Sequence, residues 1–234
     1  MKQYLGQKRI LVAVDCIIFG FDGQDLKVLL IKRGFEPEKD KWSLLGGFLQ
    51  KNETLDEAAN RVLKELTGLE KVYMEQLQVF SDVDRDPQER TVSVAYFALI
   101  DILQYEKQLS ENYHAEWFVL NNKPRLIFDH EDMVNLAQKH LRYKGALHPI
   151  LFELLPYKFT IPQVQNMFAE VCDTELDSRN FTRKVHSTGL LIRQTGKDKS
   201  GSRKGAFYYK LDKRQYKLKQ GSFLNFIPKR DKIF

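Results

Sequence analysis

Short apolar runs recur through the first 145 residues, and their composition predicts strands. "ILVAVDCIIFGF" and "DGQDLKVLLIKRG" are rich in Val, Ile and Leu and meet at an Asp-Gly turn between Gly20 and Gly23, which predicts a hairpin. "WSLLGGFL" is a further short apolar segment with a glycine pair. "MEQLQVF", "TVSVAYFALI" and "AEWFVL" are predicted strands as well, and the polar loop "SDVDRDPQER" separates the first two.

Two stretches of the same region have helical signals. Thr54 is the predicted N-cap of one helix, Glu57 completes its capping box, and Gly68 is the predicted C-cap. In "HEDMVNLAQKHLRYK" the helical spacing of apolar residues predicts a second helix; these residues are Met133, Leu136, Ala137 and Leu141. The first part of the chain is therefore predicted to mix α and β structure.

The pattern changes near Gly145–Pro149, which predicts two domains, residues 1–145 and 146–234. "HPILFELL" is a predicted short helix, and "TIPQVQNMFAEVC" a second with an apolar face. "DSRNFTRKVHST" is a predicted third helix, with Asp177 or Ser178 as N-cap and Gly189 as its stop. The strands "LLIRQT" and "AFYYKL" then flank the loop "GKDKSGSRKG".

Charge separates the two parts further. The net charge of the whole chain is +6, yet residues 146–234 contain 17 Lys and Arg against 8 Asp and Glu, whereas residues 1–145 are slightly acidic. This asymmetry favours an anionic partner for the second domain, although a basic solvated surface has the same composition. The two cysteines form no paired motif, and no segment has the length of a membrane span or the pattern of a signal peptide, so a cytoplasmic location is expected.

One stretch of the first domain carries a spaced motif. Glycine, glutamate, arginine and leucine positions between residues 47 and 69 fall in the register of the Nudix signature; they are Gly47, Glu53, Arg61, Leu63, Glu65, Gly68 and Leu69. The first domain therefore resembles the Nudix fold, an α/β sandwich with a mixed sheet. The resemblance implies a loop and helix that hold a divalent metal against a pyrophosphate.

The metal-binding face of this motif is incomplete. Three glutamates are expected on one face of the helix, but Val62 and Leu66 occupy two of those positions and leave Glu65 alone. One interpretation is a divergent hydrolase that recruits carboxylates from "SDVDRD". The favoured interpretation is a former active site kept as a binding pocket, because apolar side chains cannot hold a metal. We therefore expect no catalytic residues, no metal and no cofactor.

The second domain resembles a winged helix-turn-helix. Its third predicted helix presents a polar face of Arg179, Asn180, Thr182, Arg183 and His186 opposite a small apolar stripe, which suits base and phosphate contacts. The following loop would be a wing that tracks the phosphate backbone with Lys197, Lys199, Arg203 and Lys204. A solvated basic face and a surface hairpin are the alternatives for these two features.

Together the two domains resemble the Nudix-related transcriptional regulators of NrtR type. The resemblance implies a homodimer that binds double-stranded operator DNA and releases it when a metabolite binds the first domain. "RVLKELTGL", "DRDPQERTVSVAYFALI" and "LIFDH" look closest to the arabinose-responsive AraR branch, which implies a pentose effector such as L-arabinose. The alternatives are an ADP-ribose-responsive regulator of NAD metabolism, an active Nudix hydrolase, and an RNA-binding or scaffolding protein.

A sugar site needs polar groups and an aromatic plane. The candidates for effector binding lie near the former active site: Asp15, Arg33, Trp42, Gly46, Gly47, Glu65, Asp84, Arg85 and Arg90. Fewer than half of them are expected to touch the ligand. The histidines at 114, 130, 140 and 148 have no ligand spacing and are expected to be structural or exposed.

Overall fold

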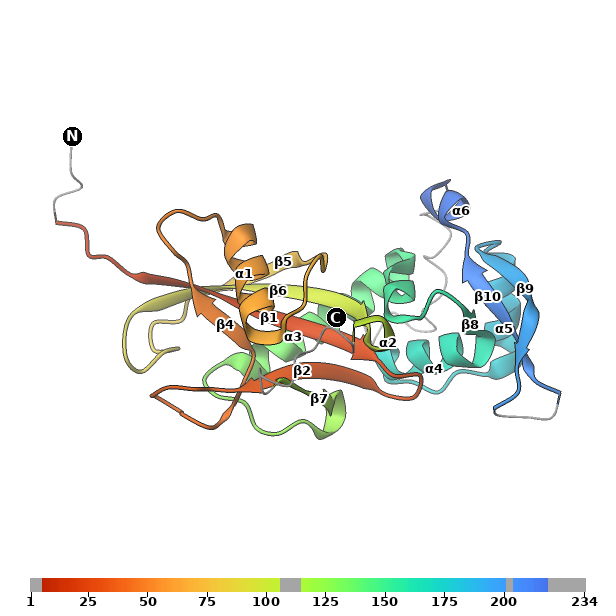
Figure 1. The fold of residues 1–234 in the computed structure, drawn as a ribbon, viewed down its shortest axis with the longest axis horizontal. Helices are drawn as coiled ribbons and strands as arrows, with labels where there is room; N and C mark the ends of the chain where they lie inside the picture. Colours follow the sequence, from red (N-terminus) through yellow and green to blue (C-terminus); the bar gives the residue numbers. More distant parts are fainter. Residues whose placement is uncertain (1–5, 106–114, 201–203, 219–234) are drawn as a thin grey trace.

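The computed structural model describes residues 6–105, 115–200 and 204–218. A sheet-based part and a smaller helical part follow one another along the long axis (Figure 1). The sheet contains β1 (Leu11–Phe21), β2 (Leu26–Lys32), β3 (Trp42–Ser43), β4 (Leu45–Phe48), β5 (Glu75–Phe80), β6 (Thr91–Asp101) and β7 (Ala115–Val119).

Pairing in this sheet is mixed, as predicted. The strand order is β3-β2-β1-β6-β5, with β4 paired to β1 and β7 to β2. Strand β1 runs parallel to β6 along its whole length, and the predicted hairpin forms as the antiparallel pair β1–β2. Strand β1 is buried from Ala13 onward, because alternate side chains enter two different cores on the two faces of the sheet.

Helix α1 (Leu55–Thr67) covers one face of the sheet with Ala58, Ala59, Val62 and Leu63. The sequence signals at its ends are confirmed. Thr54 and Glu57 form a reciprocal capping box, and Gly68 ends the helix in the left-handed region, with φ 78°. Helix α1 and strand β4 therefore hold the connection between them, residues 49–54, in place.

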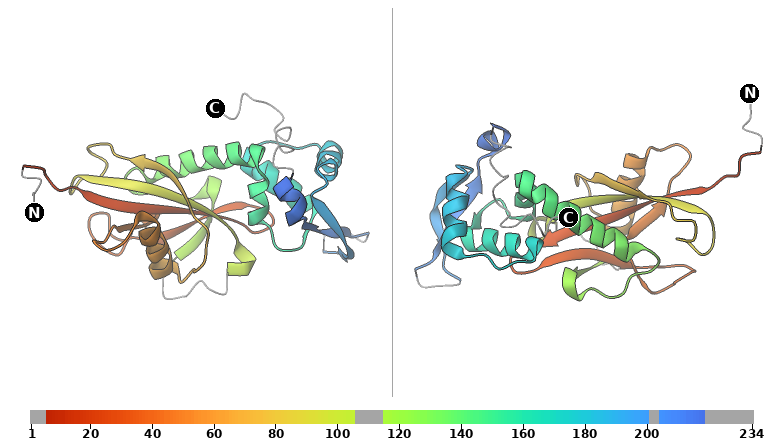
Figure 2. Two further views of the ribbon diagram at one scale, coloured as in Figure 1. Left: turned by 90° about the horizontal axis from the view of Figure 1, so that it is seen from above. Right: turned by 180° about the vertical axis from the view of Figure 1, so that it is seen from behind.

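Helix α3 (His130–Leu147) covers the other face, as the left view of Figure 2 shows. The short helix α2 (Ile102–Tyr105) and the 3-10 segments η2 (Leu120–Asn122) and η3 (Pro149–Leu154) complete this part. The segment "HPILFELL", predicted as a short helix, is the 3-10 turn η3, which begins at Pro149. Helix α3 extends two residues beyond the predicted domain boundary at residue 145.

The second part is a winged helix, as predicted. It contains β8 (Phe159–Thr160), α4 (Ile161–Cys172), α5 (Ser178–Ser187), β9 (Leu191–Asp198), β10 (Ala206–Leu211) and α6 (Lys213–Leu218), with sheet order β8-β10-β9. Asp177 is the N-cap of α5. Strand β9 is longer than predicted, because Lys197 and Asp198 still pair with β10 and are not part of the loop.

One apolar core joins the two parts. Phe19 and Phe21 of β1 belong to the same buried cluster as Phe152 of η3 and Phe168 of α4. Among the described residues, no helix is both long enough and apolar enough to cross a membrane.

Candidate functional site

A cavity of about 470 Å³ lies beside the glycine pair of β4 and helix α1, and we call it the α1 cavity. Strand β1 contributes Asp15, and the end of β2 contributes Arg33. Gly46 and Gly47 form part of the wall, and there is no room for side chains there. A Cβ atom on Gly46 would collide with Asp15 Oδ1, and one on Gly47 would lie 2.7 Å from Val62 Cγ2.

The α1 side of this cavity is built for packing. Val62 is 2% exposed and fills the space behind Gly47, while Leu66 lines the cavity itself. Glu65 points elsewhere, because its side chain is 58% exposed and forms an ion pair with Arg61 at 3.0 Å. The residues present therefore do not fit the divalent metal that a Nudix motif implies. Within residues 6–105, 115–200 and 204–218, no group of three potential metal ligands occurs anywhere.

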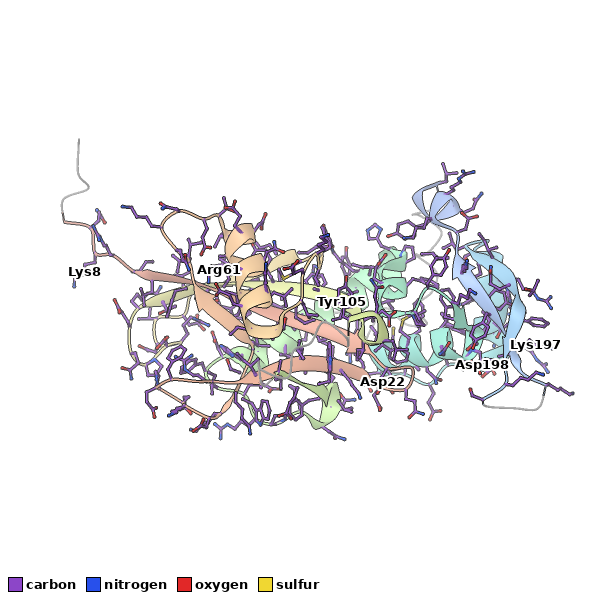
Figure 3. All side chains as sticks on the ribbon, viewed as in Figure 1. Lys8, Asp22, Arg61, Tyr105, Lys197 and Asp198 are labelled. Carbon is purple, nitrogen blue, oxygen red and sulfur yellow. The ribbon has the colours of Figure 1, made fainter. Side chains whose placement is uncertain are left out.

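Glu53 and Arg61 retain a structural role in the motif. Arg61 donates hydrogen bonds to both Glu53 carboxylate oxygens, at 2.8 and 2.6 Å, and to the carbonyl oxygen of Phe48 at 3.0 Å. Hydrogen bonding from Arg61 lowers the pKa of Glu53 to about 2. These bonds tie the loop that follows β4 to helix α1. Figure 3 labels Arg61 on α1.

The opposite side of the α1 cavity holds buried charges. Arg85 is 4% exposed and donates from Nε and Nη2 to the two oxygens of Asp129, both at 2.8 Å. Asp15 lies 3.7 Å from the same guanidinium and accepts a hydrogen bond from Ser93 Oγ at 2.5 Å. Arg85 therefore pairs with two carboxylates. Asp15 lies on β1, Arg85 on the loop after β5, and Asp129 immediately before α3.

His130 belongs to this group, although its spacing in the sequence gives no signal. The backbone N–H of Leu44 donates to His130 Nδ1 at 3.1 Å, which places the ring proton on Nε2, 3.7 Å from Asp15 Oδ1. Burial lowers the pKa of His130 below its ordinary value, so the ring is neutral at pH 7. The expectation that this histidine is structural or exposed is incomplete, because it is buried and lines the α1 cavity.

An arginine between aromatic rings lies at the cavity wall. The guanidinium carbon of Arg33 lies 4.0 Å from the ring centre of Phe35 and 5.4 Å from that of Phe128. Arg33 Nε donates to the Phe35 carbonyl at 3.1 Å. Both rings line the cavity with Arg33, so this wall combines a cation with apolar planes.

The nine predicted effector residues divide into two groups. Five line the α1 cavity: Asp15, Arg33, Gly46, Gly47 and Arg85. The other four do not line it: Trp42, Glu65, Asp84 and Arg90. Arg90 instead bonds the carbonyls of Ser81, Asp82 and Thr91, which holds its own loop. Sequence reasoning missed several residues that line the cavity, among them Phe35, Phe128 and His130. Asp86, from the "SDVDRD" segment of the hydrolase interpretation, lines it as well.

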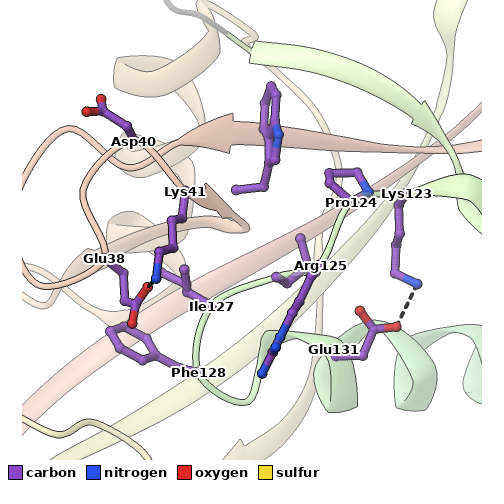
Figure 4. A pocket seen from close by; sticks show the side chains of 11 residues that line it. Glu38, Asp40, Lys41, Lys123, Pro124, Arg125, Ile127, Phe128 and Glu131 are labelled. Atoms are coloured by element: carbon purple, nitrogen blue, oxygen red, sulfur yellow. Dashed lines mark ion pairs between the residues drawn. The ribbon is translucent and has the colours of Figure 1, made fainter.

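Trp42 lines a neighbouring cavity of about 840 Å³, the Trp42 cavity, seen from close by in Figure 4. Lysines and carboxylates at its rim pair with one another. Lys123 contacts Glu131 at 2.6 Å, and Lys41 pairs with Glu38. Both lysines of this cavity are therefore already paired with carboxylates.

The winged helix presents the predicted polar face of α5. Phe181 and Val185 point into the core. Four predicted residues are exposed and a fifth, Thr182, is partly exposed; the four are Arg179, Asn180, Arg183 and His186. Arg183 donates to the Asn180 side chain at 3.0 Å. The helix thus offers charged and amide groups on one accessible face.

The hairpin β9–β10 carries further cations at the end of the molecule remote from α1 (Figure 3). Lys197 and Lys199 are exposed, as is Lys204 in the turn before β10, whereas Arg203 lies outside the described residues. Arg193, which the sequence did not single out, lies with its guanidinium carbon 3.5 Å from the ring centre of Phe207, and Lys197 Nζ lies 4.3 Å from it. Both cations lie on β9 and contact the same aromatic ring.

A mixed sheet with a Nudix loop and helix, joined to a winged helix, defines a Nudix-type transcriptional regulator. The chain matches the NUDIX domain family over residues 9–140 and the NrtR DNA-binding winged helix domain family over residues 151–211. The protein belongs to the NrtR family of Nudix-related transcriptional regulators.

Two curated relatives illustrate this similarity. The ADPR responsive transcriptional repressor NtrR of Acinetobacter baylyi is 33% identical over 210 residues, which is 88% of this chain and 84% of the relative. The ADP-ribose pyrophosphatase of Methanocaldococcus jannaschii is 38% identical over 147 residues, 62% of this chain and 82% of the relative. The predicted closeness to the arabinose branch is not supported, since the repressor relative is ADP-ribose responsive.

Solved structures agree with the family. Shewanella oneidensis NrtR complexed with a 27mer DNA has a TM-score of 0.77 at 28% identity and covers 88% of this chain and 95% of that one. The NUDIX domain of the same protein complexed with ADP ribose has a TM-score of 0.51 at 29% identity, covering 60% and 94%. The whole two-domain arrangement therefore has a structural counterpart.

Proposed function

We propose that this protein is an ADP-ribose-responsive regulator that binds operator DNA through its winged helix and releases it when ADP-ribose enters the α1 cavity. The observation that carries this proposal is the difference between the apolar α1 wall of that cavity and its arginine-containing walls. Its former metal face is apolar at Val62 and Leu66, while two arginines, Arg33 and Arg85, line other walls. That combination suits a bound anion that is not hydrolysed.

The chemistry of ADP-ribose fits the walls of the cavity better than a pentose does. A diphosphate pairs with guanidinium groups, and a planar base packs against aromatic rings. Arg33, Phe35 and Phe128 offer both features on one wall. A neutral sugar would offer no anion to Arg33, which lines the cavity and forms no carboxylate ion pair among the described residues. The ligands named for two relatives, the A. baylyi repressor and the S. oneidensis NUDIX domain, support the same choice.

Hydrolysis is the second candidate function, favoured by the similarity to a pyrophosphatase. The residues of this chain argue against it, because Val62 and Leu66 cannot bind magnesium and the remaining Glu65 is held by Arg61 outside the cavity. We therefore propose binding without turnover. A regulator of this kind acts in the cytoplasm, where its operator lies.

DNA binding is assigned to α5 and the β9–β10 hairpin, in a homodimer that reads two half-sites. If Arg183 reads a base, Arg183→Ala weakens binding to a duplex selected from a random pool by about 1–3 kcal/mol and relaxes its specificity. If Lys204 contacts a phosphate, Lys204→Ala weakens binding to all duplexes and lowers the salt dependence. Fluorescence anisotropy at several salt concentrations measures both. Equal affinity of wild type and both variants would contradict the assignment.

The effector is tested by calorimetry and thermal unfolding. ADP-ribose should bind and raise the unfolding temperature, whereas L-arabinose should do neither. Arg33→Gln should weaken the ADP-ribose signal, while Lys41→Gln, at the Trp42 cavity, should leave it unchanged. Incubation of ADP-ribose with the protein and magnesium or manganese should release no product. Steady product release that Glu65→Gln abolishes would establish the hydrolase instead.

A further inference from the structure

Helix α3 begins at the α1 cavity and ends at the winged helix. Its first residue, His130, lines the cavity, and Asp129 immediately precedes it. The helix then runs along the face of the sheet until its far end lies beside α4, as the left view of Figure 2 shows. Met133, Ala137 and Leu141 are buried in the core shared by both parts of the protein. A packed helix of this kind moves as one unit.

At the cavity end, the buried Arg85 holds Asp129 immediately before α3, next to the hydrogen bond from Leu44 N–H to His130. Arg85 lines the α1 cavity, whereas its partner Asp129 is not among the lining residues. A ligand therefore meets Arg85 from one side while Asp129 holds it from the other. Asp129 is 19% exposed, so its carboxylate can be hydrated when Arg85 turns to another anion.

At the far end, α3 bonds directly to the helix-turn-helix. Arg142 Nε donates to the carbonyl oxygen of Val171 at 2.8 Å. Val171 lies in the last turn of α4, where carbonyl groups lack partners within the helix and a cation is favourable. Phe168 of α4 in turn packs on Phe181 of α5, with ring centres 5.7 Å apart. A displacement of α3 therefore reaches the DNA-facing helix through two contacts.

We infer that Arg85 and Asp129 form the trigger, and α3 with Arg142 the lever, by which the α1 cavity controls DNA binding. This inference rests on the proposed function. An anionic effector draws Arg85 away from Asp129, the start of α3 is released, and the helix shifts against the sheet. Through Arg142 the shift moves α4 and with it α5. A neutral ligand leaves the ion pair intact and gives no response.

Two substitutions test the lever at its two ends. Asp129→Asn removes the charge that holds Arg85 but keeps the shape of the side chain. Arg142→Met keeps most of the aliphatic stem and removes the donor to Val171. The matched control is Glu131→Gln, which also turns a carboxylate into an amide in the first turn of α3 but breaks only the ion pair with Lys123 at the Trp42 cavity.

The full chain is measured by ADP-ribose calorimetry and by operator anisotropy with and without saturating ADP-ribose. In the wild type and in Glu131→Gln, ADP-ribose should weaken operator binding by a factor of roughly 5–150. In Arg142→Met, ADP-ribose should still bind, but the factor should fall towards one. In Asp129→Asn, operator binding should already be weaker without effector, and ADP-ribose should change it less.

The outcomes separate this inference from the proposed function. If ADP-ribose weakens operator binding of Arg142→Met and Asp129→Asn by the wild-type factor, the lever is wrong and the proposed function stands. If ADP-ribose does not bind the wild type, the proposed function fails. In that case, the operator affinities of the variants measured without ADP-ribose still test the inference. Weaker operator binding by Asp129→Asn than by Glu131→Gln supports the trigger, and equal binding overturns it.

Discussion

The two sides of the α1 cavity differ in the chemistry of their side chains. On the α1 side, Arg61 still ties Glu53 to the loop, but Val62 and Leu66 have turned the metal face into a packing surface. On the α3 side, Asp15 and Arg85 are almost fully buried charges at 7% and 4% exposure. The comparison teaches that one cavity can combine an apolar packing wall with a wall of buried charges.

The α3 side should be the more sensitive to loss of one charge. Arg85→Met leaves the buried Asp15 and the partly buried Asp129 without their cation, and removal of one partner from a buried ion pair costs about 3–5 kcal/mol. Arg61→Met, the matched change on the α1 side, affects a more exposed side chain and should lower the free energy of unfolding much less. Urea unfolding of both variants measures the difference, and equal losses would contradict it.

A steric change probes the α1 side. A Cβ atom on Gly47 would lie 2.7 Å from Val62 Cγ2, so Gly47→Ala overpacks the contact and should cost about 1–3 kcal/mol of unfolding free energy. Combining it with Val62→Ala makes room for the new methyl group. The double variant should therefore lose less than the sum of the two single changes. Strict additivity in urea unfolding would show that this contact is not the cause.

The two sides should also respond to acid in different pH windows. The pKa of His130 is lowered by burial, so the unfolded chain takes up the proton first and stability falls as the pH drops below about 6.5, by at most about 1.4 kcal/mol per pH unit for one group. The pKa of Glu53 is lowered to about 2, so its contribution is full above about 4.5 and is lost as the pH falls towards 2. His130→Asn should flatten the first window and Glu53→Gln the second, measured by unfolding at each pH.

Local signals in the sequence predicted the elements that depend on them. The capping box at Thr54 and the hairpin at the Gly20–Gly23 turn occur as predicted, because each depends on neighbouring residues. Of the two predicted N-caps of α5, Asp177 and Ser178, the structure uses Asp177. Helical spacing also placed Val62 and Leu66 on one side of α1, and in the structure Val62 packs against Gly47 while Leu66 lines the α1 cavity. The length of β9 was underestimated, because pairing with β10 extends it into the glycine- and lysine-rich loop.

The opposite wall of the cavity could not be predicted in the same way. His130 and Arg85 lie 115 and 70 residues from Asp15, and only the pairing of β1 with β6 and the packing of α3 bring them together. The pentose prediction is not supported by the similarity to an ADP-ribose-responsive repressor. It relied on short sequence resemblances, which do not reveal that two arginines line the same cavity.

The central claim is that ADP-ribose in the α1 cavity controls DNA binding by the winged helix. The most direct measurement is the dissociation constant of the full chain for its selected duplex, determined by anisotropy with and without saturating ADP-ribose. The account predicts a roughly 5–150-fold weaker complex with ADP-ribose, and the same factor in ADP-ribose affinity between free and DNA-bound protein. An unchanged dissociation constant, with ADP-ribose bound at the same time, would contradict it.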